Sequence, residues 1–187
     1  LFNLCIALQD LNKLDESETI CRKLIKIKPD FAEAHFNLGF IMQQLNRFNE
    51  SEVCYKTVIS LKPNWPEAYF NLGNTLKKLN RFQESESAYK QAIKIKPDYA
   101  EAFNNLGNVK KMLGKFNAAA KNYQIAIKLN PTYSEARINL NTVNMTLVPS
   151  WHLKMMNDET RNKAYLEAIQ KVVDKESHVL EIGTGSG

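Results

Sequence analysis

Residues 67–97 read EAYFNLGNTLKKLNRFQESESAYKQAIKIKP, and closely related stretches recur along the 187-residue chain at steps of 34 residues. A proline closes each unit, and leucine, glycine and tyrosine residues keep the same step. These series are Pro29, Pro63, Pro97 and Pro131; Leu4, Leu38, Leu72, Leu106 and Leu140; Gly39, Gly73 and Gly107; and Tyr55, Tyr89 and Tyr123. A fixed period of this length indicates one small structural unit that is stacked several times.

Each unit contains two amphipathic helical patterns. In the unit before the quoted stretch, the apolar positions are Ala34, Leu38, Ile41 and Leu45, then Val53, Val58 and Leu61. The turn between the two patterns carries Asn12, Asn46, Asn80 or Gly114. Asparagine and glycine adopt left-handed backbone angles at low cost, so each of these residues is predicted to end a first helix.

Small residues and prolines complete the unit. Gly39, Gly73 and Gly107 are each predicted to face a small residue of the second helix, namely Ser51, Ser85 and Ala119. A side chain in place of the glycine would force the two helices apart. The proline of each unit ends the second helix, because it has no N–H for the helical ladder.

The pattern resembles the tetratricopeptide repeat (TPR), a helix–turn–helix unit. The resemblance implies an all-α superhelix over residues 1–147. We expect a partial repeat at 1–31, complete repeats at 32–65, 66–99 and 100–133, and a capping helix at 134–146, followed by a second region at 148–187.

Composition excludes several classes of protein. The net charge of +5 is spread along the helices, which favours a solvated surface over a nucleic-acid site. No apolar run approaches the roughly 20 residues of a membrane span. Cys5, Cys21 and Cys54 lack the spacing of metal ligands, and we interpret them as small core residues in a reducing compartment. We therefore expect no metal and a cytoplasmic protein, with a nuclear location left open.

One asparagine series points to a binding surface. Asn37, Asn71, Asn105 and Asn139 share one position of the first helices, which line the concave wall of such an array. An asparagine amide donates and accepts hydrogen bonds, as a peptide backbone does. We expect a protein or peptide partner along this row, and Glu33, Glu67, Glu101 and Glu135 beside it favour basic segments. The alternative is that these side chains serve only helix starts and bonds between repeats.

The last forty residues follow a different pattern. Pro149 interrupts the helix before it, residues 151–173 read as another amphipathic helix, and residues 179–187 read VLEIGTGSG. An apolar strand followed by a glycine-rich turn is typical of the first half of a Rossmann-like nucleoside-binding sheet. On its own this motif is weak evidence.

Residues 150–187 resemble the opening of the protein arginine N-methyltransferases. The resemblance rests on two motifs in the same order and distance, HLKMMNDETRN at 152–162 and VLEIGTGSG at 179–187. It implies the truncated start of a Rossmann-like α/β methyltransferase domain that uses S-adenosylmethionine. The residues that would polarise the substrate guanidinium are expected beyond Gly187, so we predict no catalytic residue and no methyl transfer within residues 1–187.

The resemblance also implies roles for cofactor-binding residues. Gly183, Gly185 and Gly187 would let the loop pass beneath the methionine part of S-adenosylmethionine. Arg161 would pair with the cofactor carboxylate, since a guanidinium matches that anion with two hydrogen bonds. Asp158 would orient Arg161, while His152 and Met155 would line the cofactor near the reacting methyl group. The alternatives are a surface ion pair for Arg161 with Asp158 and plain core packing for Met155.

Together these patterns favour part of an arginine methyltransferase whose TPRs recruit protein substrates. Two alternatives remain: a non-catalytic TPR interaction scaffold, and a different S-adenosylmethionine-dependent methyltransferase with TPRs. A glycosyltransferase with similar repeats is disfavoured, because the glycine-rich motif follows too soon after them.

Overall fold

The computed structural model describes residues 1–147 and 158–172. The chain divides into two units, Leu1–Leu147 and Val148–Gly187. The described helices are α1 (Phe2–Asp10), α2 (Leu14–Ile27), α3 (Ala32–Gln44), α4 (Phe48–Leu61), α5 (Pro66–Lys78), α6 (Phe82–Ile95), α7 (Ala100–Met112), α8 (Phe116–Leu129), α9 (Ser134–Leu147) and α11 (Glu159–Val172).

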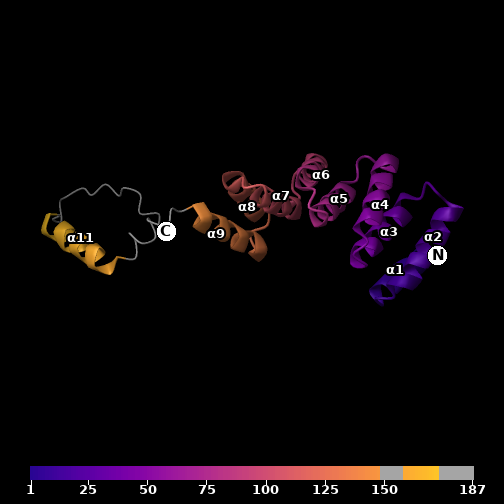
Figure 1. Ribbon diagram of the computed structural model, residues 1–187, viewed down its shortest axis with the longest axis horizontal. Coiled ribbons are helices and arrows are strands. Elements are labelled where there is room, and N and C mark those ends of the chain that lie inside the picture. The colour runs from indigo at the N-terminus through magenta and orange to yellow at the C-terminus, as the bar shows by residue number, and fades with distance from the viewer. Residues whose placement is uncertain (148–157, 173–187) are drawn as a thin grey trace. The chain divides into compact units, whose positions relative to one another are not determined.

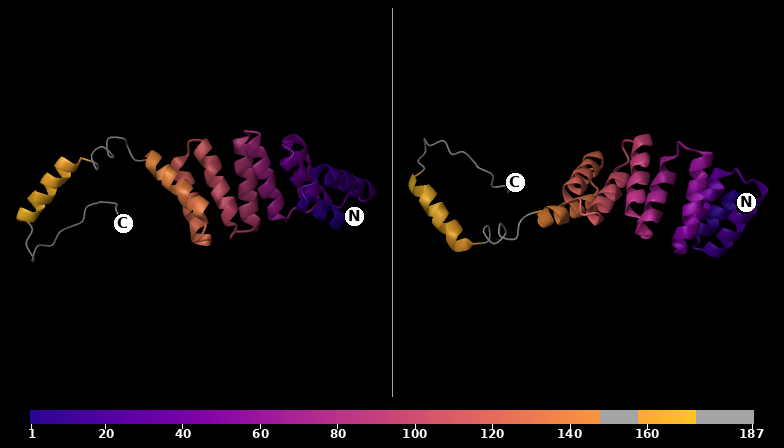
Figure 2. Two further views of the ribbon diagram at one scale, coloured as in Figure 1. Left: turned by 90° about the horizontal axis from the view of Figure 1, so that it is seen from below. Right: turned by 45° about the horizontal axis from the view of Figure 1, so that its top comes forward.

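The first unit is a row of helix pairs that follow one another in chain order (Figures 1 and 2). The pairs are α1/α2, α3/α4, α5/α6 and α7/α8, and α9 packs against α8. Every described element is a helix, so the predicted all-helical repeat array is confirmed for residues 1–147. In the second unit the structure describes α11 alone, which lies within the predicted amphipathic helix. The predicted strand and glycine turn at 179–187 lie outside the described residues.

The turns between paired helices follow the sequence closely. Asn12, Asn46 and Asn80 have φ of 57°, 58° and 59°, and Gly114 has φ of 71°. These residues end the first helices in the left-handed region, as predicted. Second helices end at Ile27, Leu61, Ile95 and Leu129, each two residues before the repeat proline.

The glycine of each repeat lies against a tyrosine ring, which corrects the prediction that only a small residue faces it. A Cβ placed on Gly39, Gly73 or Gly107 would come within 3.0, 2.7 or 2.5 Å of a ring carbon of Tyr55, Tyr89 or Tyr123, respectively. The predicted serines are nearby in another role: Ser51 Oγ donates to the Gly39 carbonyl at 2.9 Å, and Ser85 Oγ to the Gly73 carbonyl at 2.7 Å. The glycine therefore makes room for a ring, and the serine ties the two helices together.

The buried core continues from one repeat to the next. Tyr55 of α4 packs with Leu72 and Leu76 of α5, and Tyr89 of α6 packs with Leu106 and Val109 of α7. Each second helix thus completes its core on the first helix of the following repeat, so no repeat is stable by itself. The buried face of α4 carries Cys54, Tyr55 and Val58, whereas Val53, predicted to be apolar core, is 65% exposed.

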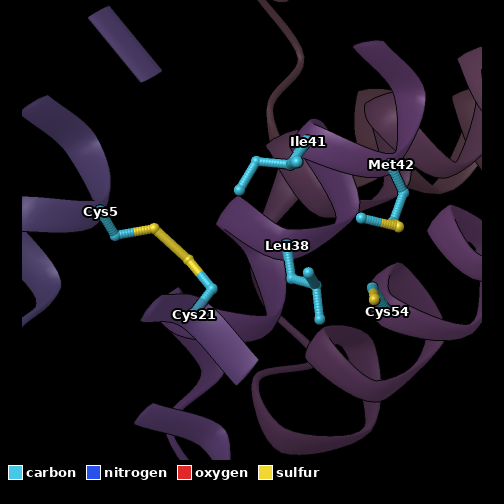
Figure 3. Close-up of a cluster of buried hydrophobic side chains, with 6 residues drawn as sticks. All are labelled: Cys5, Cys21, Leu38, Ile41, Met42 and Cys54. Atoms are coloured by element: carbon cyan, nitrogen blue, oxygen red, sulfur yellow. A yellow bond between two sulfur atoms is a disulfide. The ribbon is translucent and has the colours of Figure 1, made fainter. Parts of the chain in front are cut away.

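The cysteines differ in part from the sequence prediction. Cys5 of α1 and Cys21 of α2 are joined by a disulfide, and both are fully buried (Figure 3). This corrects their interpretation as separate thiols in a reducing compartment. Cys54 is a buried free thiol beside Leu38 and Met42, and burial raises its pKa to about 11. Cys54 is therefore a small core residue, as expected.

Candidate peptide-binding surface

The predicted asparagine row lies on the first helices of successive repeats. Asn37, Asn71, Asn105 and Asn139 belong to α3, α5, α7 and α9, and all four are half-buried. Their spacing follows from the repeat, because equivalent positions of stacked helices fall side by side. Their hydrogen bonds differ from one repeat to the next.

Asn105 is tied to the repeat before it. Its Nδ2 donates to Asn74 Oδ1 at 2.9 Å, and the same oxygen accepts a hydrogen bond from the Tyr89 hydroxyl at 2.7 Å. The Tyr89 ring is fully buried. Asn74 therefore links the core of one repeat to the row residue of the next, and the Asn105 amide has a structural role in addition to any binding role.

Asn139 makes a similar bond through a different partner. Its Nδ2 donates to Asn104 Oδ1 at 3.0 Å. The Asn104 amide is fully buried and donates in turn to Glu135 Oε1 at 3.0 Å and to the Tyr133 hydroxyl at 3.2 Å. A buried amide costs free energy unless it is satisfied, so this network fixes how α9 lies on α7.

Asn71 lies in the middle of the row, and its side chain makes no hydrogen bond within residues 1–147. Its backbone carbonyl accepts from Gln43 Nε2 at 3.1 Å and from Thr75 Oγ1 at 2.9 Å. Gln43 is itself held by Thr75 and by the Tyr55 hydroxyl. The backbone of Asn71 is thus firmly placed while its amide keeps both its donors and its acceptor for a ligand.

Asn37 lies one repeat earlier, where its backbone carbonyl accepts from Gln9 Nε2 at 3.4 Å. Its Nδ2 is shielded from solvent and has no hydrogen-bond partner among the described residues. An unsatisfied buried amide group costs about 1–3 kcal/mol. The free energy of ordering Asn37 is therefore recovered only if a partner approaches it.

The glutamates beside the row are partly engaged. Glu33 forms an ion pair with Lys62, whose ammonium holds the pKa of that carboxyl below its ordinary value. Glu135 accepts from Asn104. The other two, Glu67 and Glu101, form no ion pair within the described residues, so the acidic row is weaker than the sequence pattern indicated.

Sequence reasoning missed the amides that support the row. Asn74 and Asn108 are 34 residues apart, and each accepts a hydrogen bond from the tyrosine of its own repeat, Tyr89 or Tyr123. The shared step was the available signal. Which neighbour each amide contacts depends on the rotation between repeats, which the period does not specify.

Two of the predicted cofactor residues are described. Asp158 Oδ1 accepts a hydrogen bond from the Arg161 backbone N–H at 2.9 Å, so Asp158 caps the start of α11. The guanidinium Nη2 of Arg161 lies 3.3 Å from Asn162 Oδ1. His152, Met155, Gly183, Gly185 and Gly187 lie outside the described residues. Within residues 1–147 and 158–172, no cluster of His, Cys, Asp and Glu could hold a metal, and no helix could span a membrane.

Family comparisons match the repeats and not the C-terminal region. A model described as "TPR repeat" matches residues 43–80 and 73–114, and two described as "Tetratricopeptide repeat" match residues 1–31 and 100–133. These ranges follow the 34-residue period, and they cover helices α1 to α8 in large part.

Solved structures share the fold at low sequence identity. MamA is 23% identical with a TM-score of 0.71, over 89% of this chain and 94% of its own. YrrB, described as a TPR protein with an unusual peptide-binding site, is 16% identical with a TM-score of 0.67, over 90% and 83%. The first TPR of Spaghetti (RPAP3), bound to an HSP90 peptide, is 23% identical with a TM-score of 0.61, over 62% and 92%. At these identities the likeness concerns the fold alone.

One curated relative has a chemical function. An arginine N(omega)-methyltransferase of Streptomyces achromogenes subsp. streptozoticus is 45% identical over 40 residues. The match spans 21% of this chain and 11% of the relative. It is therefore a local similarity to a small part of a longer enzyme.

Proposed function

The helical array of this chain belongs to the tetratricopeptide-repeat family, and we propose that its first helices bind an extended polypeptide segment through the asparagine row. Repeats of this kind point to a protein-interaction module. The observation that carries the proposal is Asn71, whose backbone is held by Gln43 and Thr75 while its amide has no partner inside the protein. An amide placed in advance loses little entropy when it binds a peptide group.

The proposed contact reads the backbone of the ligand and not its side chains. An asparagine can donate to a peptide carbonyl and accept from the adjacent N–H at the same time. Asn105 and Asn139 each use one N–H for a bond between repeats, which leaves the second N–H and the carbonyl of each amide for the ligand. The row thus offers peptide groups a regular set of partners with little dependence on ligand sequence.

The test is binding of short fluorescent peptides of degenerate sequence to the 187-residue chain, followed by fluorescence anisotropy. Asn71→Ala removes one donor and one acceptor, and we expect the affinity to fall by about five- to tenfold. Asn122→Ala is the matched control, because Asn122 lies on second helix α8 and bonds to the Ala118 carbonyl of its own turn. Equal affinities for the two variants would reject the row as the binding surface.

We further propose that the array serves a protein arginine N-methyltransferase, with residues 148–187 belonging to its cofactor-binding region. The 45% identity over 40 residues to an arginine N(omega)-methyltransferase supports this, together with the two motifs at 152–162 and 179–187. S-adenosylmethionine would supply the methyl group. In this proposal Arg161 pairs with the cofactor carboxylate, and the repeats recruit the protein that is methylated.

The cap on α11 allows a sharp test of this second proposal. Asp158 fixes the backbone of Arg161 at the first turn of the helix. We propose calorimetry with S-adenosylhomocysteine on a longer protein that contains residues 148–187. Arg161→Ala should weaken binding by at least about tenfold, since a charged hydrogen bond contributes about 1.5–3 kcal/mol. Lys163→Ala, which changes an exposed cation on the same helix, should leave binding unchanged. Asp158→Asn keeps a good cap and removes the charge, so it separates the two effects of Asp158.

A further inference from the structure

A pocket of about 310 Å³ lies where the end of α3 meets the second half of α5. Its lining residues, Gln43, Gln44, Asn46, Phe48, Asn74, Lys77 and Lys78, come from α3, the following turn, the start of α4 and α5. We call it the lysine pocket. It adjoins the asparagine row on both sides, because Gln43 bonds to the Asn71 carbonyl and Asn74 bonds to Asn105.

The polar groups that the lysine pocket offers are mostly donors. The Asn74 carbonyl oxygen already accepts from Tyr89 and Asn105, so the half of this amide that remains for a ligand is the NH₂ group. Both ends of the Gln43 amide are engaged with Tyr55, Asn71 and Thr75. The remaining charged groups of the lining are two ammonium groups, which have donors and no acceptor.

Lys77 is the more enclosed of the two lysines. Its side chain is half-buried, and burial lowers its pKa, an effect that the charge of Glu135 opposes and that of Lys78 reinforces. Glu135 is held by Asn104, and neither lysine forms an ion pair within the described residues. A partly desolvated cation without a partner is unfavourable, so an anionic ligand group would be bound strongly here.

We propose that the lysine pocket receives a carboxylate group of the peptide that binds along the asparagine row. This inference rests on the peptide-binding function proposed above and adds a preference to it. Asn74, Lys77 and Lys78 lie within about one turn of each other on α5, so their donors converge on one anion. The bound segment would then place an acidic group beside the site where Asn71 holds its backbone.

The experiment uses the 187-residue chain and three pools of fluorescent degenerate peptides. The first pool has a fixed internal Glu and an amidated C-terminus, the second has Gln at that position and an amidated C-terminus, and the third has Gln and a free C-terminal carboxylate. We expect one of the carboxylate pools to bind about tenfold more tightly than the second pool, as one charge-assisted contact allows. A gain in the first pool identifies a side-chain carboxylate, and a gain in the third identifies a chain end.

Two variants tie the preference to the lysine pocket. Lys77→Met keeps the length of the side chain and removes its charge, and it should abolish the preference while the affinity for the second pool stays the same. Lys94→Met changes an exposed lysine of α6 and should retain the preference. Binding of all three pools with equal affinity, or a preference that survives Lys77→Met, would overturn the inference and leave peptide binding intact. Failure of every pool to bind would instead reject the proposed function itself.

Discussion

Cys5 and Cys21 are joined by a disulfide at the two positions where each complete repeat pairs a glycine with a tyrosine ring. One step of 34 residues leads from Cys5 to Gly39 and from Cys21 to Tyr55. The later repeats close their helix pair by packing a ring on bare backbone, and residues 1–31 close theirs with a covalent bond. Both arrangements hold the two helices at the same place, and they respond differently to reductant.

We predict that reduction of the disulfide destabilises α1 and α2. Opening a loop of this size, with the cysteines 16 residues apart, costs about 3 kcal/mol in the chain-entropy account. Hydrogen exchange of the α1 and α2 amides, with and without dithiothreitol, measures the effect. The double variant Cys5→Gly/Cys21→Tyr restores the pair of the later repeats, so its exchange should not respond to reductant. An equal response in the wild type and this variant would contradict the assignment.

A second prediction concerns the glycines under the tyrosine rings. Alanine at Gly39, Gly73 or Gly107 places a Cβ 3.0, 2.7 or 2.5 Å from the facing ring. Such crowding typically costs about 1–3 kcal/mol. Urea unfolding should therefore rank the three variants in that order, with Gly107→Ala the least stable. The reverse order would show that the rings move aside without cost.

A third prediction concerns acid stability. Glu86 is nearly buried, and its carboxylate contacts the ammonium groups of Lys90 at 2.6 Å, Lys110 at 3.1 Å and Lys115 at 3.6 Å. The hydrogen bond from Lys90 lowers the pKa of Glu86 from 4.5 to about 2, against the opposing effect of burial and with help from Lys110. Since the folded pKa is below the unfolded one, this stabilisation is present above pH 4.5 and is lost as the pH falls toward 2.

The measurement is the free energy of unfolding between neutral pH and the acid limit of folding. Wild type should lose about 2 kcal/mol more than Glu86→Gln across this window, because the variant has no carboxylate to protonate there. Parallel pH profiles for the two proteins would assign the acid sensitivity to other carboxylates.

A fourth prediction separates the structural asparagines from the binding asparagine. Asn105→Ala removes the bond to Asn74 between repeats and should cost about 1 kcal/mol of stability. Asn71→Ala removes no bond inside the protein and should change stability by less than about 0.5 kcal/mol. Chemical unfolding of both variants tests the contrast. Equal losses of stability would place Asn71 in the same structural role as Asn105.

The regular parts of this fold were predictable because they depend on local chemistry. Asn46 at a helix end and Pro63 after the next helix act within a few residues, so their positions in the sequence determine theirs in the structure. The tyrosine opposite each glycine was missed because Ser51 and Tyr55 lie one turn apart on α4. Period alone does not say which of them covers the Gly39 Cα and which bonds to its carbonyl.

The hydrogen bonds of the candidate site were harder to predict for the same physical reason. Asn71 and Asn105 are equivalent in the period, yet only Asn105 bonds to an amide of the preceding repeat, because Asn74 stands where α3 has Phe40. The bonding of a row residue thus depends on a single side chain of its neighbour. Asp158 and Arg161 illustrate the opposite case, since a cap three residues before its partner is a local feature.

The central claim is that the asparagine row binds the backbone of an extended peptide, and N-methylation of the ligand tests it most directly. N-methyl groups on alternate residues of a degenerate peptide pool remove backbone donors and leave the side chains unchanged. We predict that the 187-residue chain binds the methylated pool at least about tenfold more weakly than the unmethylated one, and that the difference shrinks in Asn71→Ala. Equal affinity of the wild-type chain for both pools would contradict the account.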